Sequence, residues 1–130
     1  MKKTYATSMP NHIGAFLKAS KCFASLGINI TRVSYDKAVD SHMLFLDVEG
    51  TEEQIRKADK LEKIEKLNQI AKNRGQTLAQ MALAWLYNRE EITSVLIGAS
   101  KPEQIIENLA MINNLNFTDE ELKQIDSIAL

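Results

Sequence analysis

The sequence has little of several residue types that mark particular classes of protein. A single cysteine, Cys22, cannot form an internal disulfide, which is typical of a reducing compartment. The 16 lysine and arginine residues nearly balance the 17 aspartate and glutamate residues. The net charge of −1 therefore gives no electrostatic reason to expect nucleic acid or an anionic membrane as a partner.

Long hydrophobic runs are also missing. The longest uninterrupted apolar run, Met81–Leu86, is far too short to span a bilayer. Polar residues rather than an apolar core follow the basic start Met1-Lys2-Lys3, so this start does not resemble a signal peptide. We therefore expect a cytoplasmic protein without a membrane partner.

What is present has the makeup of a soluble globular protein, with 45% hydrophobic and 25% charged residues. A length of 130 residues fits one ordinary domain or two very small ones. His42 begins an expected strand, and no residue at metal-ligand spacing accompanies it, so we expect no metal site. Cys22 lies near an apolar helical stripe and is interpreted as a packing residue rather than a nucleophile.

The first third of the chain predicts a strand, a glycine-bearing loop, a helix and a second strand. Thr4–Met9 alternates in the manner of a strand. Apolar residues then recur at helical spacing over Ile13–Leu26. Gly27 stops this helix where a left-handed cap is usual. Ile28–Tyr35 is the next strand, and its alternation slips in a way that indicates a bulge.

A third strand is expected at His42–Val48, which carries apolar groups on both faces and should therefore lie inside the sheet. The pieces Asn11-x-x-Gly14-Ala15-Phe16, Leu26–Ile30 and Met43–Gly50 together resemble the ACT family of amino-acid-sensing regulatory domains. That resemblance implies a ferredoxin-like βαββαβ fold, a small amino acid or similar metabolite as ligand, and a homodimer.

Carried over by position, the ACT resemblance implies a ligand site in the first loop and at the start of the second strand. Its residues would be Asn11, His12, Ile13, Gly14 and Asn29. The alternative is structural: Asn11 caps the first helix and Asn29 satisfies a turn.

From Gly50 onward the chain is expected to be helical. Four pairs have the spacing of a capping box, in which the first residue caps the helix and the fourth reaches back. They are Thr51…Gln54, Thr77…Gln80, Ser100…Glu103 and Thr118…Glu121. Apolar residues from Ile55 to Leu67 recur every three positions, a stripe that drifts around a 3.6-residue helix. We therefore expect a bend or break near Lys60–Lys63.

The second half resembles the C-terminal end of an aldo-keto reductase barrel. The stretches that carry this resemblance are Leu67–Ala71, Arg74–Trp85, Thr93–Ser100 and Gln104–Leu109. The resemblance implies that the strand end and the following helix start contact the adenosine side of NADPH. A helix amino terminus is locally suited to phosphate. The residues concerned are Gly98, Ser100, Gln104, Glu107 and Asn108.

A complete (β/α)₈ barrel needs about 250 residues. The strands that carry the family's catalytic Asp, Tyr, Lys and His have no match here, so we expect no catalytic residues and no reductase chemistry from this chain alone. No bound cofactor is expected, and NADP(H) binding would be only a remnant.

The combined prediction is an α+β protein with an ACT-like βαββ module over 1–62 and a reductase-like helical part over 63–130. The missing fourth strand of the ferredoxin-like sheet is assigned to Thr93–Ile97, antiparallel to Thr4–Met9, because an unpaired first strand would expose its edge. The predicted function is non-catalytic binding of an amino acid. The alternatives are an incomplete reductase piece with residual NADP(H)-binding elements, and a fusion fragment without an evolved function.

Overall fold

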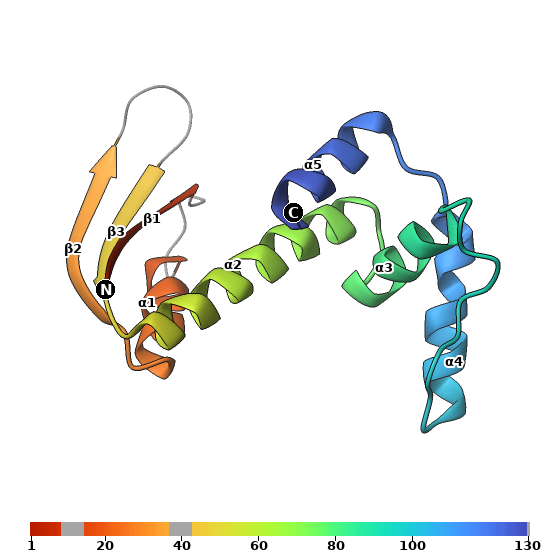
Figure 1. Cartoon of the computed structure of the whole chain (residues 1–130), viewed down its shortest axis with the longest axis horizontal. Coiled ribbons are helices and arrows are strands. Elements are labelled where there is room, and N and C mark those ends of the chain that lie inside the picture. Colours follow the sequence, from red (N-terminus) through yellow and green to blue (C-terminus); the bar gives the residue numbers. More distant parts are fainter. Residues whose placement is uncertain (9–14, 37–42, 130) are drawn as a thin grey trace. The chain divides into compact units, whose positions relative to one another are not determined.

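The computed structural model describes residues 1–8, 15–36 and 43–129, which form two compact units (Figure 1). The first unit is Met1–Glu62 and the second is Lys63–Leu130. Sequence predictions on residues 9–14 lie outside the described part of the chain, among them the site residues Asn11, His12, Ile13 and Gly14.

The first unit consists of a sheet and helices. Its elements are β1 (Lys2–Ser8), α1 (Ala15–Ser25), β2 (Asn29–Asp36), β3 (Met43–Glu49) and the first part of α2 (Glu52–Asn73). The strands and helix expected from the alternation and the apolar stripe are therefore confirmed, with ends that differ by one or two residues.

The sheet of this unit has the order β1-β3-β2, with β3 antiparallel to both neighbours. The apolar residues on both faces of β3 predicted its central place. In the structure one face of β3 is buried and the other is half-buried. The bulge expected in β2 is confirmed, because the register with β3 shifts between Ile30 and Arg32. The order β1-β3-β2 leaves β1 at an edge among the described strands.

The core of the first unit lies between the sheet and the helices. Its buried members come from β1, β3, α1, α2 and the residue before β2: Tyr5, Phe23, Ile28, Leu44, Leu46, Val48, Ile55 and Ala58. Gly27 ends α1 with φ +69°. The Gly27 amide donates to the Ala24 carbonyl and the Ile28 amide to the Phe23 carbonyl, which is a Schellman cap as expected.

Helix α2 is one continuous helix, so of the bend or break expected near Lys60–Lys63 the break is wrong. Its apolar residues serve two cores instead of one. Ile55 and Ala58 are buried in the first unit, and Ile70 and Ala71 in the second. Between them, where the stripe turns away from both cores, Leu61 and Ile64 are 43% and 49% exposed.

The second unit is helical. After the end of α2 it contains α3 (Leu78–Tyr87), α4 (Pro102–Leu109), the 3₁₀ helix Ala110–Asn114, labelled η1, and α5 (Asp119–Ala129). Its core is formed by the buried residues Ile70, Ala71, Met81 and Ile125, with Leu67, Leu78, Trp85, Phe117 and Ile128 packed against them.

Three of the four expected capping boxes are confirmed. Thr51, Thr77 and Thr118 each accept a hydrogen bond from the amide three residues on, and the side chain there accepts one from the threonine amide. The fourth, Ser100…Glu103, is wrong by one residue. Pro102 starts α4, and the Gln104 side chain rather than that of Glu103 accepts from the Ser100 amide at 2.8 Å.

Thr93–Ile97 was assigned as the fourth strand of the sheet, and this assignment is wrong. These residues form no strand within the described structure, whose sheet consists of β1, β3 and β2. A strand exists only where a neighbour completes its hydrogen bonds, and a strand-like sequence does not supply one. Leu96, at the centre of this segment, is 94% exposed.

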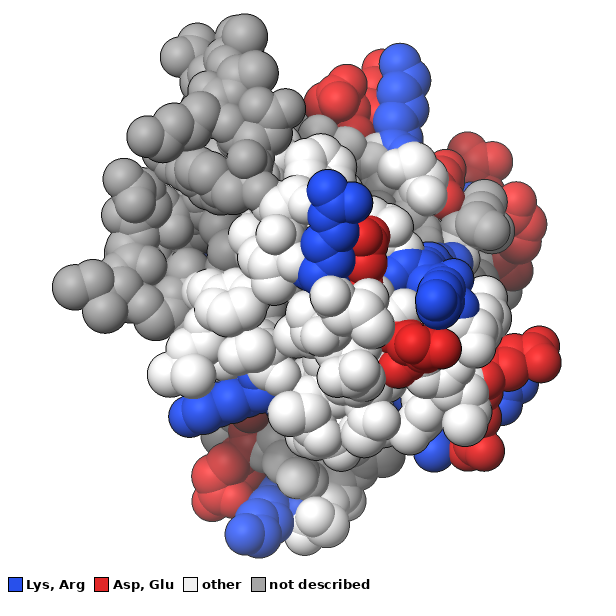
Figure 2. All heavy atoms as spheres, turned by 90° about the vertical axis from the view of Figure 1, so that its left-hand side faces the viewer, with Lys and Arg blue, Asp and Glu red and all other residues white. Residues whose placement is uncertain are grey.

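Two further observations concern the surface. Figure 2 faces the side of the molecule on which β2 is drawn in Figure 1. The described part of this surface is mostly uncharged, with basic and acidic side chains interspersed.

No helix among the described residues is long and apolar enough to cross a membrane.

Candidate functional site

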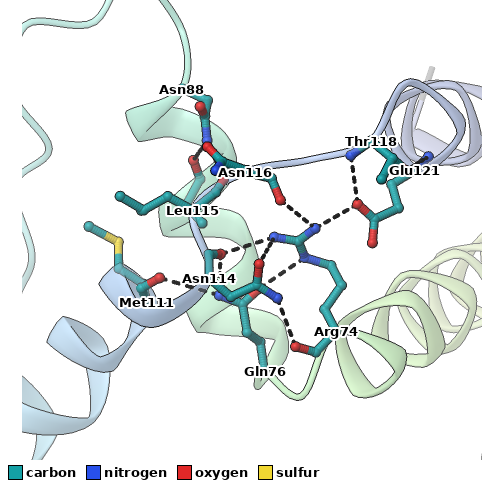
Figure 3. Close-up of polar contacts among 10 residues, drawn as sticks. Arg74, Gln76, Asn88, Met111, Asn114, Leu115, Asn116, Thr118 and Glu121 are labelled. Carbon is teal, nitrogen blue, oxygen red and sulfur yellow. Dashed lines mark hydrogen bonds and ion pairs between the residues drawn. The ribbon is translucent and has the colours of Figure 1, made fainter.

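The most extensive polar cluster of the second unit surrounds Arg74, which directly follows α2 (Figure 3). Its side chain is only 2% exposed. Gly75, with φ +69°, turns the chain there, and the Gly75 and Gln76 amides donate to the carbonyls of Lys72 and Ala71. This Schellman cap ends α2 and turns the chain toward α3, which starts after Thr77.

Every N–H of the Arg74 guanidinium has an acceptor. Nε donates to the Gln76 side chain at 3.0 Å, and Nη1 to the Glu121 carboxylate at 2.7 Å and the Asn116 carbonyl at 3.1 Å. Nη2 donates to the carbonyl and side-chain oxygens of Asn114 at 3.0 and 3.4 Å. The Phe117 ring lies 3.8 Å from the guanidinium carbon.

The neighbours of Arg74 are tied to each other as well. The Asn114 side chain donates back to the Arg74 carbonyl at 2.9 Å, and Gln76 donates to the Asn114 carbonyl at 2.9 Å. Asn88, at the end of α3, donates to the Leu115 carbonyl. Since five N–H groups are all that a guanidinium has, no donor is left for a ligand. The cluster holds residues 111–121 against the α2–α3 turn and is structural.

The start of α4 is a second polar part of the second unit, and its polar residues are exposed. Gly98 has no atom within 4 Å of an added Cβ, and Ser100 and Lys101 are exposed. The Gln104 side-chain oxygen is engaged, since it accepts from the amides of Ser100 and Lys101 at 2.8 and 3.3 Å and from the Ser100 hydroxyl at 3.2 Å. Pro102 occupies the first turn of α4, where its missing N–H costs nothing.

The five residues expected to contact a nucleotide thus lie on one short stretch, from the residues before α4 to its last turn. The Glu107 carbonyl accepts from the Gln80 side chain at 2.7 Å, which attaches α4 to α3. The Glu107 side chain is exposed and Asn108 is half-buried. The fifth residue of the other expected site, Asn29, is the first residue of β2, is exposed, and lies opposite Glu49 of β3.

A second ionisable cluster, in the first unit, was not anticipated from the sequence. The Tyr5 hydroxyl donates to Asp59 at 2.6 Å, and the Lys3 ammonium pairs with the same carboxylate oxygen at 2.6 Å. Burial, together with the hydrogen bond to Asp59, raises the pKa of Tyr5 well above its ordinary value. Because Tyr5 keeps its proton, the cluster does not provide an acid. Its hydrogen bonds join β1 to α2. The alternation of Lys3 and Tyr5 on β1 indicates the shared face, but nothing in the sequence identifies Asp59 as their partner.

No group of histidine, cysteine, aspartate and glutamate side chains among the described residues is arranged to hold a metal ion. Cys22 is exposed on α1 rather than packed, so its expected role in the core is wrong.

Most of the chain is similar to known proteins. The family model described as "Aldo/keto reductase family" matches residues 29–130. Two curated relatives are named L-glyceraldehyde 3-phosphate reductase. The protein of Escherichia coli O157:H7 is 58% identical over 60 residues, and that of Escherichia coli strain K12 is 57% identical over 60 residues. Each alignment covers 46% of this chain and 17% of the relative.

A third relative is a putative voltage-gated potassium channel subunit beta of Schizosaccharomyces pombe. It is 39% identical over 69 residues, which are 52% of this chain and 20% of the relative. The chain therefore matches about a fifth or less of the length of these relatives.

These matches contradict the expectation of an amino-acid-binding regulatory protein. The family match starts at residue 29 and includes β2 and β3, which had been assigned to an ACT-like module. The reductase resemblance of the second half is confirmed. The alternative interpretation, a partial aldo-keto reductase, agrees with the comparisons.

Proposed function

Because this chain belongs to the aldo/keto reductase family, we propose that its second unit is the C-terminal part of a reductase and supplies binding groups for the adenosine side of NADP(H). The observation that carries the proposal is the exposed start of α4, with Gly98, Ser100, Gln104, Glu107 and Asn108 on one stretch.

The side chains present fit such a ligand chemically. The exposed Lys101 ammonium and the amino end of α4 suit a phosphate, and the Ser100 hydroxyl can donate to it by giving up its 3.2 Å bond to the Gln104 side chain. At this turn the Gln104 side chain accepts hydrogen bonds through its oxygen, so its NH₂ group remains available as a donor. Asn108 and Glu107 offer acceptors for an adenine amino group. When bound, the cofactor supplies a hydride. The role of the residues in this stretch is to bind and orient the cofactor.

Reduction of a substrate needs more than these groups. The relatives of which this chain matches 17% are named as reductases of an aldehyde phosphate, and we propose a small aldehyde as the substrate class of any complete assembly that includes this segment. The Arg74 cluster and the Tyr5 cluster are both internally satisfied, so neither offers a free acid to such a substrate.

The proposal is tested by amide NMR of the full chain titrated with adenosine 2′,5′-bisphosphate. We expect shifts concentrated on the amides of residues 98–108, with weak, millimolar affinity because the rest of a binding site is not supplied. Nicotinamide mononucleotide, the other half of the cofactor, should cause no shifts there.

Two matched serine variants sharpen the experiment. Ser100→Ala should weaken binding several-fold, whereas Ser127→Ala, at an exposed serine of α5, should leave it unchanged. Shifts scattered over both units, or equal affinity in the two variants, would show that the stretch before α4 is not a nucleotide site.

For the first unit we propose a ferredoxin-like, ACT-like topology. The element order β1-α1-β2-β3-α2 and the strand order β1-β3-β2 support it, because that fold places its first strand beside its third. Antiparallel pairing of β2 with β3 differs from the all-parallel barrel of the reductase family. Hydrogen exchange should therefore protect the three strands as one cooperative group.

A further inference from the structure

The segment between α3 and α4 has unpaired backbone groups. In Figure 1 residues 93–99 run as a coil between these two helices, and no described residue hydrogen-bonds to their backbone amides or carbonyls. Lys101, which follows, is extended, with φ −140° and ψ 146°. Unpaired backbone groups are a template for pairing with another chain.

The side chains of this segment suit pairing. Residues 93–100 are Thr-Ser-Val-Leu-Ile-Gly-Ala-Ser, which includes no charged residue and no proline. Val95 and Ile97 favour strands, and Leu96 is 94% exposed. Natural edge strands usually carry a charge or a proline that blocks pairing, and neither interrupts this segment.

We propose that residues 93–99 pair antiparallel with the same residues of a second copy of this chain, with Leu96 on the twofold axis. This register sets Val95 opposite Ile97 of the other copy and Leu96 opposite its counterpart. It also places the Arg89–Ile92 turn, which carries Glu91, at the end of the paired segment that Lys101 of the other copy follows. The twofold axis generates this pair twice, once at each end of the paired strands.

Charge complementarity selects a second copy as the occupant. The segment is neutral, and it is acidic at its beginning (Glu90 and Glu91) and basic at its end (Lys101). An antiparallel copy therefore meets opposite charges at both ends, whereas a parallel copy places like charges side by side. The pairing does not depend on the proposed nucleotide site.

Single-cysteine variants test the register in the full chain. The natural cysteine, exposed on α1, is first removed by Cys22→Ser. In that background, Leu96→Cys should form an intermolecular disulfide on mild oxidation, because directly opposed antiparallel residues have Cα atoms about 4.5–5.5 Å apart.

Ser94→Cys provides the matched control. In the proposed register Ser94 lies opposite Gly98, so two Ser94→Cys chains should not cross-link. A mixture of Ser94→Cys and Gly98→Cys should do so. Strong self-linking of Ser94→Cys, or equal linking of all three variants, would overturn the register.

Sedimentation or light scattering over a range of concentrations tests the dimer without cross-linking. Glu91→Lys should raise the dimer dissociation constant about tenfold, because each dimer loses two facing pairs and gains like charges. The double variant Glu91→Lys with Lys101→Glu should restore dimerisation. A chain that stays monomeric at every concentration, or a double variant no better than the single one, would refute the proposal.

Discussion

Removal of the Arg74 guanidinium should destabilise the second unit more than any change of an exposed charge. In Arg74→Met the side chain keeps its apolar length but loses the ion pair with Glu121, the bonds to two backbone carbonyls and the bond to Gln76. Breaking a buried ion pair typically costs about 3–5 kcal/mol. The Glu121 side chain is 26% exposed and can rehydrate in part, so we expect the lower end, about 3 kcal/mol.

That loss is large for a unit of this size. At roughly 0.05–0.15 kcal/mol per residue, Lys63–Leu130 has a free energy of unfolding of about 3–10 kcal/mol. With a urea dependence near 1 kcal/mol per molar, the midpoint should fall by about 3 M. The single tryptophan, Trp85, packs against the core of this unit and reports its unfolding by fluorescence.

Lys123→Met is the matched control, since Lys123 is an exposed cation on α5. Its urea midpoint should change by less than about 0.5 M, because surface substitutions rarely cost more than about 0.5 kcal/mol. If Arg74→Met shifts the midpoint no more than Lys123→Met, the Arg74 cluster contributes no more than a surface pair, and the structural role given to it is wrong.

Three further predictions concern the first unit and the α3–α4 segment. The pKa of Tyr5 is raised in the folded protein, so above about pH 10 the unfolded chain loses a proton that the folded one keeps. Stability of the first unit should therefore fall as pH rises, and this fall should disappear in Tyr5→Phe, as measured by circular dichroism. Val95→Pro should leave the midpoint of urea unfolding, followed by Trp85 fluorescence, unchanged, because the Val95 amide donates to no described residue. Unfolding of this variant would show that the segment is paired within the chain. Gly27→Ala should destabilise more than Gly75→Ala in thermal unfolding followed by circular dichroism. Both glycines have φ +69°, but only at Gly27 does the new Cβ meet another group, the Gln54 side chain at 2.9 Å; equal losses would contradict this.

Elements with local signals were predictable from the sequence. The bulge in β2, the glycine cap of α1 and three threonine caps depend on residues within a few positions of one another, and each was recognised. The apolar stripe of α2 was also recognised, but its interpretation assumed one core. Spacing alone does not say that Ile55 and Ile70 belong to two different cores.

Features that depend on distant residues were not predictable. Arg74 meets groups 40 to 47 positions away, and Tyr5 meets Asp59 54 positions away. Nothing near either residue indicates those partners. The functional interpretation failed for a related reason, since the loop-helix-strand pattern around Gly14 and Asn29 is common to many folds. A long stretch of specific residues, as in Arg74–Trp85, proved the better guide to the family.

The helices of the second unit share a core of their own. Its helices bury Ile70, Met81 and Ile125 among themselves, and Arg74 completes its hydrogen bonds within the same unit. The backbone of the α3–α4 segment makes no such hydrogen bonds within the described chain, because a strand takes its hydrogen bonds from a neighbouring strand. Leu96 is correspondingly almost fully exposed, whereas Met81 on the preceding helix is 3% exposed. Pairing of this segment is thus decided by which other strand it meets, and in isolation the candidate most closely matched to its charges is a second copy of itself.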